Sequence, residues 1–172
     1  MAIVKASYTR HGGTAKASVR YIENRPGKDG TKCQRTLFTA DGRVERVEVY
    51  DMIDQANKNS YFFRLVISPD PEREDSDKNL ALREITERTI QSLEDRFQKP
   101  LQWAAAIHAD HTENRHIHAL VIVPTRLQVQ DFQRMRSAAT EVAREQRQQL
   151  DLLRETREQS QAQSQGLGLE LS

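Results

Sequence analysis

The feature that most constrains the fold of this chain is the segment 101–123, in which two apolar runs flank a short polar stretch. Four of the five histidines of the chain fall within eleven residues of this segment. The two runs, Leu101 to Ala109 and His116 to Val123, have the length and composition of β-strands. We therefore expect a β-hairpin that carries histidines on both of its strands.

Three of these histidines have a spacing that would bring them to one face of the hairpin. Side chains alternate between the two faces of a strand, so His116 and His118 point to the same side. A register that sets His108 opposite His116 adds a third imidazole, because the Cβ atoms of such a pair lie about 4.5 to 5.5 Å apart. A lone His-x-His pair is a common coincidence on a strand, whereas the pattern of three is rarer. We predict that the three residues bind one divalent metal ion with open coordination positions, which suits catalysis. His11 and His111 are expected outside this group.

The composition predicts a single globular domain. The chain has 172 residues, of which 37% are hydrophobic and 30% are charged, enough for one compact core. No run approaches the 18 or so apolar residues of a membrane-spanning helix, and the N-terminus lacks the pattern of an export signal. The single cysteine, Cys33, cannot form an internal disulfide. We expect a cytoplasmic protein with one domain over residues 1–158 and a polar, flexible tail or linker over 159–172.

Positive charge is concentrated near the N-terminus, although the whole chain has a net charge of only +1. Residues 1–35 contain eight Lys or Arg residues and two acidic residues, a net of +6. A basic region that faces a metal site suggests a phosphate-bearing polymer as the partner, and the alternative is a basic terminus without a partner. The candidate nucleic-acid-binding residues are Lys5, Arg10, Lys16, Arg20, Arg25 and Lys28.

The remaining pattern predicts an α+β fold. Strands are expected over 2–9 and 61–68, and a hairpin over 36–39 and 43–50, with Asp41-Gly42 in its turn. Helices are expected from Thr14, as the N-cap, to Asn24, and over 51–59, 78–98 and 128–158. We expect a central, mostly antiparallel, five-stranded sheet with helices packed on it and a long C-terminal helix.

A tyrosine on the first predicted helix is a candidate nucleophile. Tyr21 follows Lys16 and Arg20 and precedes Arg25, and this positive charge would favour the phenolate needed for attack on phosphorus. The alternative is that the ring packs beneath an amphipathic helix. Tyr8, at the end of the first predicted strand, is the main rival for the role.

Two segments of the chain together resemble the relaxases of plasmid mobilisation, of the MobA/MobL type within the HUH endonuclease class. The first is AKASVRYIENR at 15–25, which follows a Gly-Gly turn, and the second is IHADHTENRHIH at 107–118. The resemblance covers roughly residues 1–126 and implies the family fold, a central antiparallel sheet with packed helices. It implies that His108, His116 and His118 bind Mg or Mn and that Tyr21 is the nucleophile.

The resemblance also implies a reaction and its partners. In this reaction Tyr21 attacks the scissile phosphate of single-stranded DNA at a transfer origin, releasing a 3'-hydroxyl and leaving a 5'-phosphotyrosine that the 3'-hydroxyl can later attack. Accessory mobilisation proteins and a coupling protein are further expected partners. Asp110 and Glu113 are candidates to orient the histidines. Relaxases often continue into helicase or primase segments, so the Gln-rich end of this chain suggests a nuclease domain cut from a longer protein.

Other functions fit the same residues. A rolling-circle replication initiator or a transposase of the HUH class would use the same chemistry on a different DNA site. A metal-dependent phosphohydrolase would use bound water as nucleophile and would survive the substitution Tyr21→Phe. A non-catalytic DNA-binding module would bind single-stranded DNA with strong salt dependence and form no tyrosyl adduct.

Overall fold

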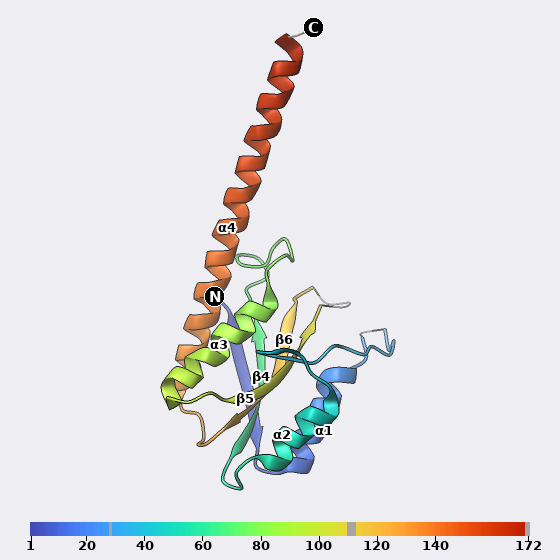
Figure 1. Ribbon diagram of the computed structural model, residues 1–172, viewed down its shortest axis with the longest axis vertical. Coiled ribbons are helices and arrows are strands. Elements are labelled where there is room, and N and C mark those ends of the chain that lie inside the picture. The colour runs from blue at the N-terminus through green and yellow to red at the C-terminus, as the bar shows by residue number, and fades with distance from the viewer. Residues whose placement is uncertain (28, 110–112, 171–172) are drawn as a thin grey trace.

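The computed structural model describes residues 1–27, 29–109 and 113–170, which form an α+β fold, as predicted (Figure 1). The strands are β1 (Ile3–Thr9), β2 (Phe38–Thr39), β3 (Gly42–Arg43), β4 (Tyr61–Ser68), β5 (Gln102–His108) and β6 (His116–Val123). The helices are α1 (Gly12–Asn24), α2 (Arg46–Gln55), α3 (Leu82–Phe97) and α4 (Val129–Glu170).

The strands form one antiparallel sheet in the order β1-β4-β6-β5-β2-β3. The prediction of five strands was one too few for the described part of the chain. The two strands of the β2–β3 hairpin, each of two residues, lie at the edge beside β5. Phe38 joins this hairpin to the sheet by pairing with Ala105 of β5.

The prediction for the second strand of this hairpin was wrong. We expected a strand from Arg43 to Tyr50, but β3 ends at Arg43 and α2 begins three residues later. A capping box favours the helix, since the backbone N–H of Glu45 donates to the carboxylate of Glu48 at 2.8 Å. In this helix Val49 and Ile53, at spacing i, i+4, are both buried in the core. The helix predicted over 51–59 therefore begins earlier and ends at Gln55.

Three other helices differ from prediction at their ends. Helix α3, predicted over 78–98, begins only at Leu82 and ends at Phe97. Helix α1 begins at Gly12, with His11 rather than Thr14 as its N-cap, and the cap residue makes no side-chain hydrogen bond. Helix α4 extends past the rest of the molecule as far as Glu170 (Figure 1). Within the segment predicted as a flexible tail, residues 159–170 therefore continue this helix, with the side chains of 159–168 exposed. None of the described helices combines the length and the apolar composition needed to cross a membrane.

Both faces of the sheet carry helices (Figure 1). Helices α3 and α4 pack on one face, where the larger core includes Phe63, Leu65, Ile85, Ile90, Ile117, Val121 and Met135. Helices α1 and α2 pack on the other face, where a smaller core includes Ala15, Val19, Ile22, Val49, Ile53, Ala106 and Leu120. On this second face the β1 edge stays open, because Ile3, Lys5 and Ser7 are exposed.

Candidate metal centre and nucleophile

The three histidines predicted as ligands converge on the face of the sheet that carries α1. His108, the last residue of β5, pairs directly with His116, the first residue of β6, which confirms the predicted register. The ring centroids of the three imidazoles, including that of His118, lie 4.4, 5.1 and 5.3 Å apart. Each ring offers one nitrogen, and these nitrogens lie within 4.8 Å of one another. The group therefore has the dimensions needed to hold a single metal ion.

Burial and charge keep His118 neutral. The side chain is 6% exposed, and this burial, followed by the charges of His108, His116, Arg25 and Arg64, lowers the pKa of His118 from 6.5 to about 3. Neither ring nitrogen of His118 has a hydrogen-bond partner within the described part of the chain. A buried polar atom without a partner is costly, so a ligand for this nitrogen would stabilise the site. A neutral imidazole also has the lone pair that a metal ion requires.

Backbone carbonyl groups orient the other two histidines. Nε2 of His108 donates to the carbonyl oxygen of Ile22 at 3.0 Å, and Nδ1 of His116 donates to that of Asn114 at 3.0 Å. Each bond fixes the orientation of its ring. Neither partner is visible in the sequence, since any residue can supply a backbone carbonyl. Of the carboxylates proposed for this role, Glu113 is exposed and Asp110 lies outside the described residues.

Tyr21 lies beside the histidine group. Its ring centroid is 6.4 Å from that of His118, and the two rings are nearly perpendicular, at 84°. The side chain is 44% exposed, so it is accessible rather than packed beneath the helix. The rival tyrosine, Tyr8, stacks on Tyr61 and Phe63, and Phe63 belongs to the core on the opposite face of the sheet. Of the two candidates that the sequence left open, only Tyr21 is close to the histidines.

Two arginines flank Tyr21. The guanidinium carbon of Arg25 lies 5.6 Å from the centre of the Tyr21 ring, and that of Arg64 lies 6.0 Å from it. Arg25 was among the predicted nucleic-acid-binding residues, whereas Arg64 was not. Lys5 is exposed on the same face, two strands away from His118 in one row of the sheet, with Val66 between them. These cations make the surroundings of Tyr21 positive.

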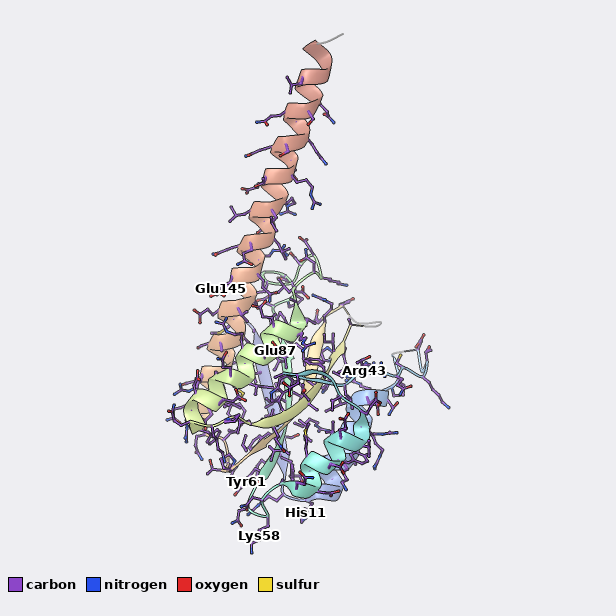
Figure 2. All side chains as sticks on the ribbon, in the orientation of Figure 1. His11, Arg43, Lys58, Tyr61, Glu87 and Glu145 are labelled. Carbon is purple, nitrogen blue, oxygen red and sulfur yellow. The ribbon has the colours of Figure 1, made fainter. Side chains whose placement is uncertain are left out.

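The other predicted basic residues lie elsewhere. Lys16 forms an ion pair with Asp54 of α2 at 2.7 Å, and Arg20 donates to the hydroxyl of Tyr50 at 3.1 Å, so both face α2. Arg10 lies 4.7 Å above the ring of Tyr61, at the opposite end of the sheet. Lys28 and His111 lie outside the described residues. His11 is at the start of α1, near the lower end of the view in Figure 2, and does not belong to the histidine group.

A buried ion pair fixes the start of β6. Arg115, the residue before His116, donates two hydrogen bonds of 2.8 Å to the carboxylate of Asp75 and a third, of 3.0 Å, to the carbonyl of Leu80. The Asp75 side chain is only 4% exposed and also accepts from the N–H of Leu80. This bidentate pair ties the histidine strand to the segment before α3. No local pattern reveals it, because the partners are 40 residues apart.

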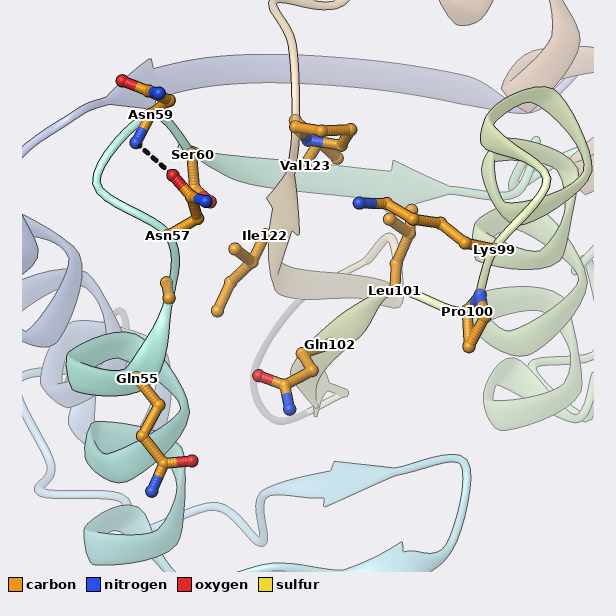
Figure 3. A pocket seen from close by; sticks show the side chains of 12 residues that line it. Gln55, Asn57, Asn59, Ser60, Lys99, Pro100, Leu101, Gln102, Ile122 and Val123 are labelled. Carbon is orange, nitrogen blue, oxygen red and sulfur yellow. Dashed lines mark hydrogen bonds between the residues drawn. The ribbon is translucent and has the colours of Figure 1, made fainter.

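A cavity lies far from Tyr21 and the three histidines. Its volume is about 440 Å³, and the connections α2–β4 and α3–β5 line it together with the end of β6 (Figure 3). Val123 in its wall is seven residues beyond His116, or about 23 Å along the strand. Lys99 is the one charged residue among those that line it. The cavity therefore lacks the concentration of reactive groups found around His118.

No protein-family model matches the chain, and no curated protein is significantly similar to it in sequence. The geometry of the residues around Tyr21 and the three histidines is therefore the guide to function.

Proposed function

We propose that the protein is a DNA relaxase, a metal-dependent enzyme that nicks one strand of DNA at a plasmid transfer origin through Tyr21 and can religate it. The observation that carries this proposal is the position of an accessible tyrosine beside three convergent histidines. The ring centroids of Tyr21 and His118 lie 6.4 Å apart. The hydrogen bond from His108 to the carbonyl of Ile22 links the histidine group to the helix of the nucleophile, because Ile22 directly follows Tyr21 on α1.

The donor set fits a divalent cation. Three imidazoles supply one nitrogen each, the pKa of His118 is about 3, and its buried ring nitrogens lack partners among the described residues. Three protein ligands leave positions open for water or phosphate oxygens. When bound there, Mg²⁺ or Mn²⁺ would supply Lewis-acid polarisation of a non-bridging phosphate oxygen.

The residues of the chain perform the bond exchange in this proposal. The hydroxyl oxygen of Tyr21 bonds to the scissile phosphorus, the bond from phosphorus to the 3'-oxygen breaks, the phenolic proton passes to solvent and the 3'-oxygen takes up a proton. The product is a 5'-phosphotyrosine with a free 3'-hydroxyl, and the reverse attack by this hydroxyl restores the strand and releases Tyr21. Arg25, whose guanidinium carbon lies 5.6 Å from the ring, places positive charge where the scissile phosphate would lie.

The test is detection of the covalent intermediate. The protein is incubated with Mn²⁺ and either a supercoiled plasmid that carries a transfer origin or a library of single-stranded origin sequences. The expected product is a nicked strand with a 5' end that is blocked until protease treatment. Tyr21→Phe should abolish both the adduct and nicking, because the nucleophile is lost. The matched control, Tyr8→Phe, removes a tyrosine hydroxyl from a residue that stacks on the other side of the sheet and should retain both.

Three outcomes would contradict the proposal. Nicking that persists in Tyr21→Phe without an adduct would indicate a phosphohydrolase that uses water. Salt-dependent binding of single-stranded DNA without an adduct at any Mn²⁺ concentration would indicate a non-catalytic binding module. Adducts formed at replication origins or transposon ends, but not at transfer origins, would indicate an initiator or a transposase of the same chemical class.

A further inference from the structure

A small cavity extends the neighbourhood of Tyr21 along the sheet. It has a volume of about 180 Å³ and lies between α1 and the strands β1 and β4. We call it the hydroxyl groove, because five of its lining residues carry hydroxyl groups and a sixth is an arginine: Ser7, Tyr8, Thr9, Thr14, Ser18 and Arg64. The ring of Tyr8 itself packs against Tyr61 and Phe63, so the other four supply the hydroxyls of the groove. A cavity lined by several hydroxyls and one guanidinium is suited to an anion with several acceptor oxygens.

Arg64 supplies the positive charge of the hydroxyl groove. It is half-buried on β4, paired with Ser7 of β1 on one side and Leu120 of β6 on the other. In the part of the chain that the structure describes, no carboxylate lies within ion-pair distance of its guanidinium. A half-buried cation is screened less than an exposed one, so it attracts an anion more strongly. Its planar set of donors matches the oxygens of a phosphate.

The hydroxyl groups can act as neutral donors to the same anion. The oxygen of Thr9 accepts a hydrogen bond from the N–H of His11 at 3.1 Å, so its own proton remains available to donate. Ser18 donates to the carbonyl of Thr14 at 3.1 Å, and rotation about one bond redirects its proton toward the cavity. The start of α1 also lies at this end of the groove, where the helix dipole favours negative charge.

The hydroxyl groove and the nucleophile share one face of α1. Thr14, Ser18, Tyr21 and Arg25 follow one another at intervals of four, three and four residues, which places them along one side of the helix. With a rise of about 1.5 Å per residue, Ser18 lies about 4.5 Å and Thr14 about 10.5 Å before Tyr21 along the helix axis. The groove therefore extends from Tyr21 in the direction away from the histidines. Arg64 lines the groove, and its guanidinium carbon lies 6.0 Å from the centre of the Tyr21 ring.

We infer that the hydroxyl groove binds a backbone phosphate of single-stranded DNA next to the scissile phosphate, with Arg64 as its charged contact and the hydroxyls as its neutral contacts. The assignment of the neighbouring phosphate as scissile rests on the proposed relaxase function, whereas binding of a strand in the groove does not require cleavage. Contacts of this kind reach phosphate oxygens and not base edges, so the groove fixes the position of the strand without reading its sequence.

The test measures the salt dependence of binding. A fluorescent oligo(dT) strand is titrated with the protein between 50 and 200 mM salt, with and without Mn²⁺, and log K is plotted against log salt concentration. For single strands the slope is about −0.7 for each phosphate that is neutralised. Arg64→Gln should therefore make the slope less steep by about 0.7 and weaken binding about tenfold. Arg64→Lys, which keeps the charge, should keep the slope.

Two further variants separate charge from hydrogen bonding. The double variant Thr14→Val with Ser18→Ala leaves Arg64 in place, so it should weaken binding without changing the slope. It also tests the groove independently of any effect of Arg64→Gln on folding. Arg134→Gln, a charge-matched control on α4 with an exposed side chain, should match the wild type. Circular dichroism and Mn²⁺ affinity should be unchanged in every variant.

The outcomes distinguish this inference from the proposed function. Should Arg64→Gln retain the wild-type slope, or the double variant bind as tightly as the wild type, the groove does not hold a phosphate. If the wild type forms the Tyr21 adduct and Arg64→Gln behaves like Arg134→Gln, the relaxase proposal stands and the groove inference fails. If no adduct forms but Arg64→Gln loses slope, the groove binds a strand and the relaxase proposal fails.

Discussion

Asp75→Asn should destabilise the protein strongly and weaken metal binding as well. The carboxylate of Asp75 is 4% exposed and holds the guanidinium of Arg115 by two bonds of 2.8 Å. Removing one partner of a buried ion pair costs about 3–5 kcal/mol, because the other charge stays in a poorly solvated place. Arg115 keeps 16% of its side-chain exposure, which gives it some access to water, so we expect the lower end, about 3 kcal/mol.

The assay is urea unfolding followed by circular dichroism. With a slope of about 2 kcal/mol per molar urea for a chain of this size, the midpoint should fall by about 1.5 M. Because Arg115 precedes His116, we also expect Mn²⁺ affinity to fall about tenfold. The control is Glu87→Gln, which breaks an exposed i, i+4 pair with Arg83 and should cost less than about 0.5 kcal/mol. Equal midpoint shifts in the two variants would refute the assigned role of the Asp75 pair.

The buried His118 and the exposed end of α4 allow two more tests. The pKa of His118 is about 3 in the folded protein and 6.5 in the unfolded chain, so between these pH values the unfolded chain binds more protons than the folded protein. The free energy of unfolding should therefore fall as the pH drops below 6.5, by up to about 1.4 kcal/mol per pH unit. Urea unfolding of the metal-free protein from pH 7 to 4 checks this against His118→Gln, which lacks the titration; parallel pH curves would contradict it. A chain that ends at Glu158 should keep the wild-type stability within about 0.5 kcal/mol, because residues 159–168 are exposed. A larger loss on thermal or urea unfolding would show that this segment packs against the domain.

The parts of the structure that sequence predicted were those encoded by local pattern. The histidine hairpin is one example, because alternation assigns His116 and His118 to one face and the predicted register, with His108 opposite His116, is the one observed. The α+β class and the presence of the long helices follow from similar periodicity. The segment after Arg43 is rich in β-branched residues, a composition compatible with a strand, and the prediction there was wrong. It forms a helix that is capped by Glu45 and Glu48.

The contacts that complete the candidate site depend on tertiary structure and could not be read from the sequence. Arg64 lies in an apolar strand, and its proximity to Tyr21 depends on the way α1 crosses the sheet. The Asp75 to Arg115 pair joins two loops, and the partner of His108 is a backbone carbonyl. The sequence predicted the right kinds of residue near the nucleophile, but it also included Lys16 and Arg20, which instead contact α2.

The sheet order explains why Tyr21 reaches the histidines. Strand β1 lies beside β4 and runs parallel to β6, so it ends at Thr9 in the same row as Ile122, at the far end of β6 from His116. Helix α1 must therefore run back along the sheet before it can reach the histidines. Tyr21 is nine residues beyond the start of α1, or about 13.5 Å along it, while His118 is four residues from Ile122, or about 13 Å along the strand. The length of α1 before Tyr21 thus matches the distance that the sheet imposes, and an inserted residue would rotate the tyrosine by about 100° away from the histidines.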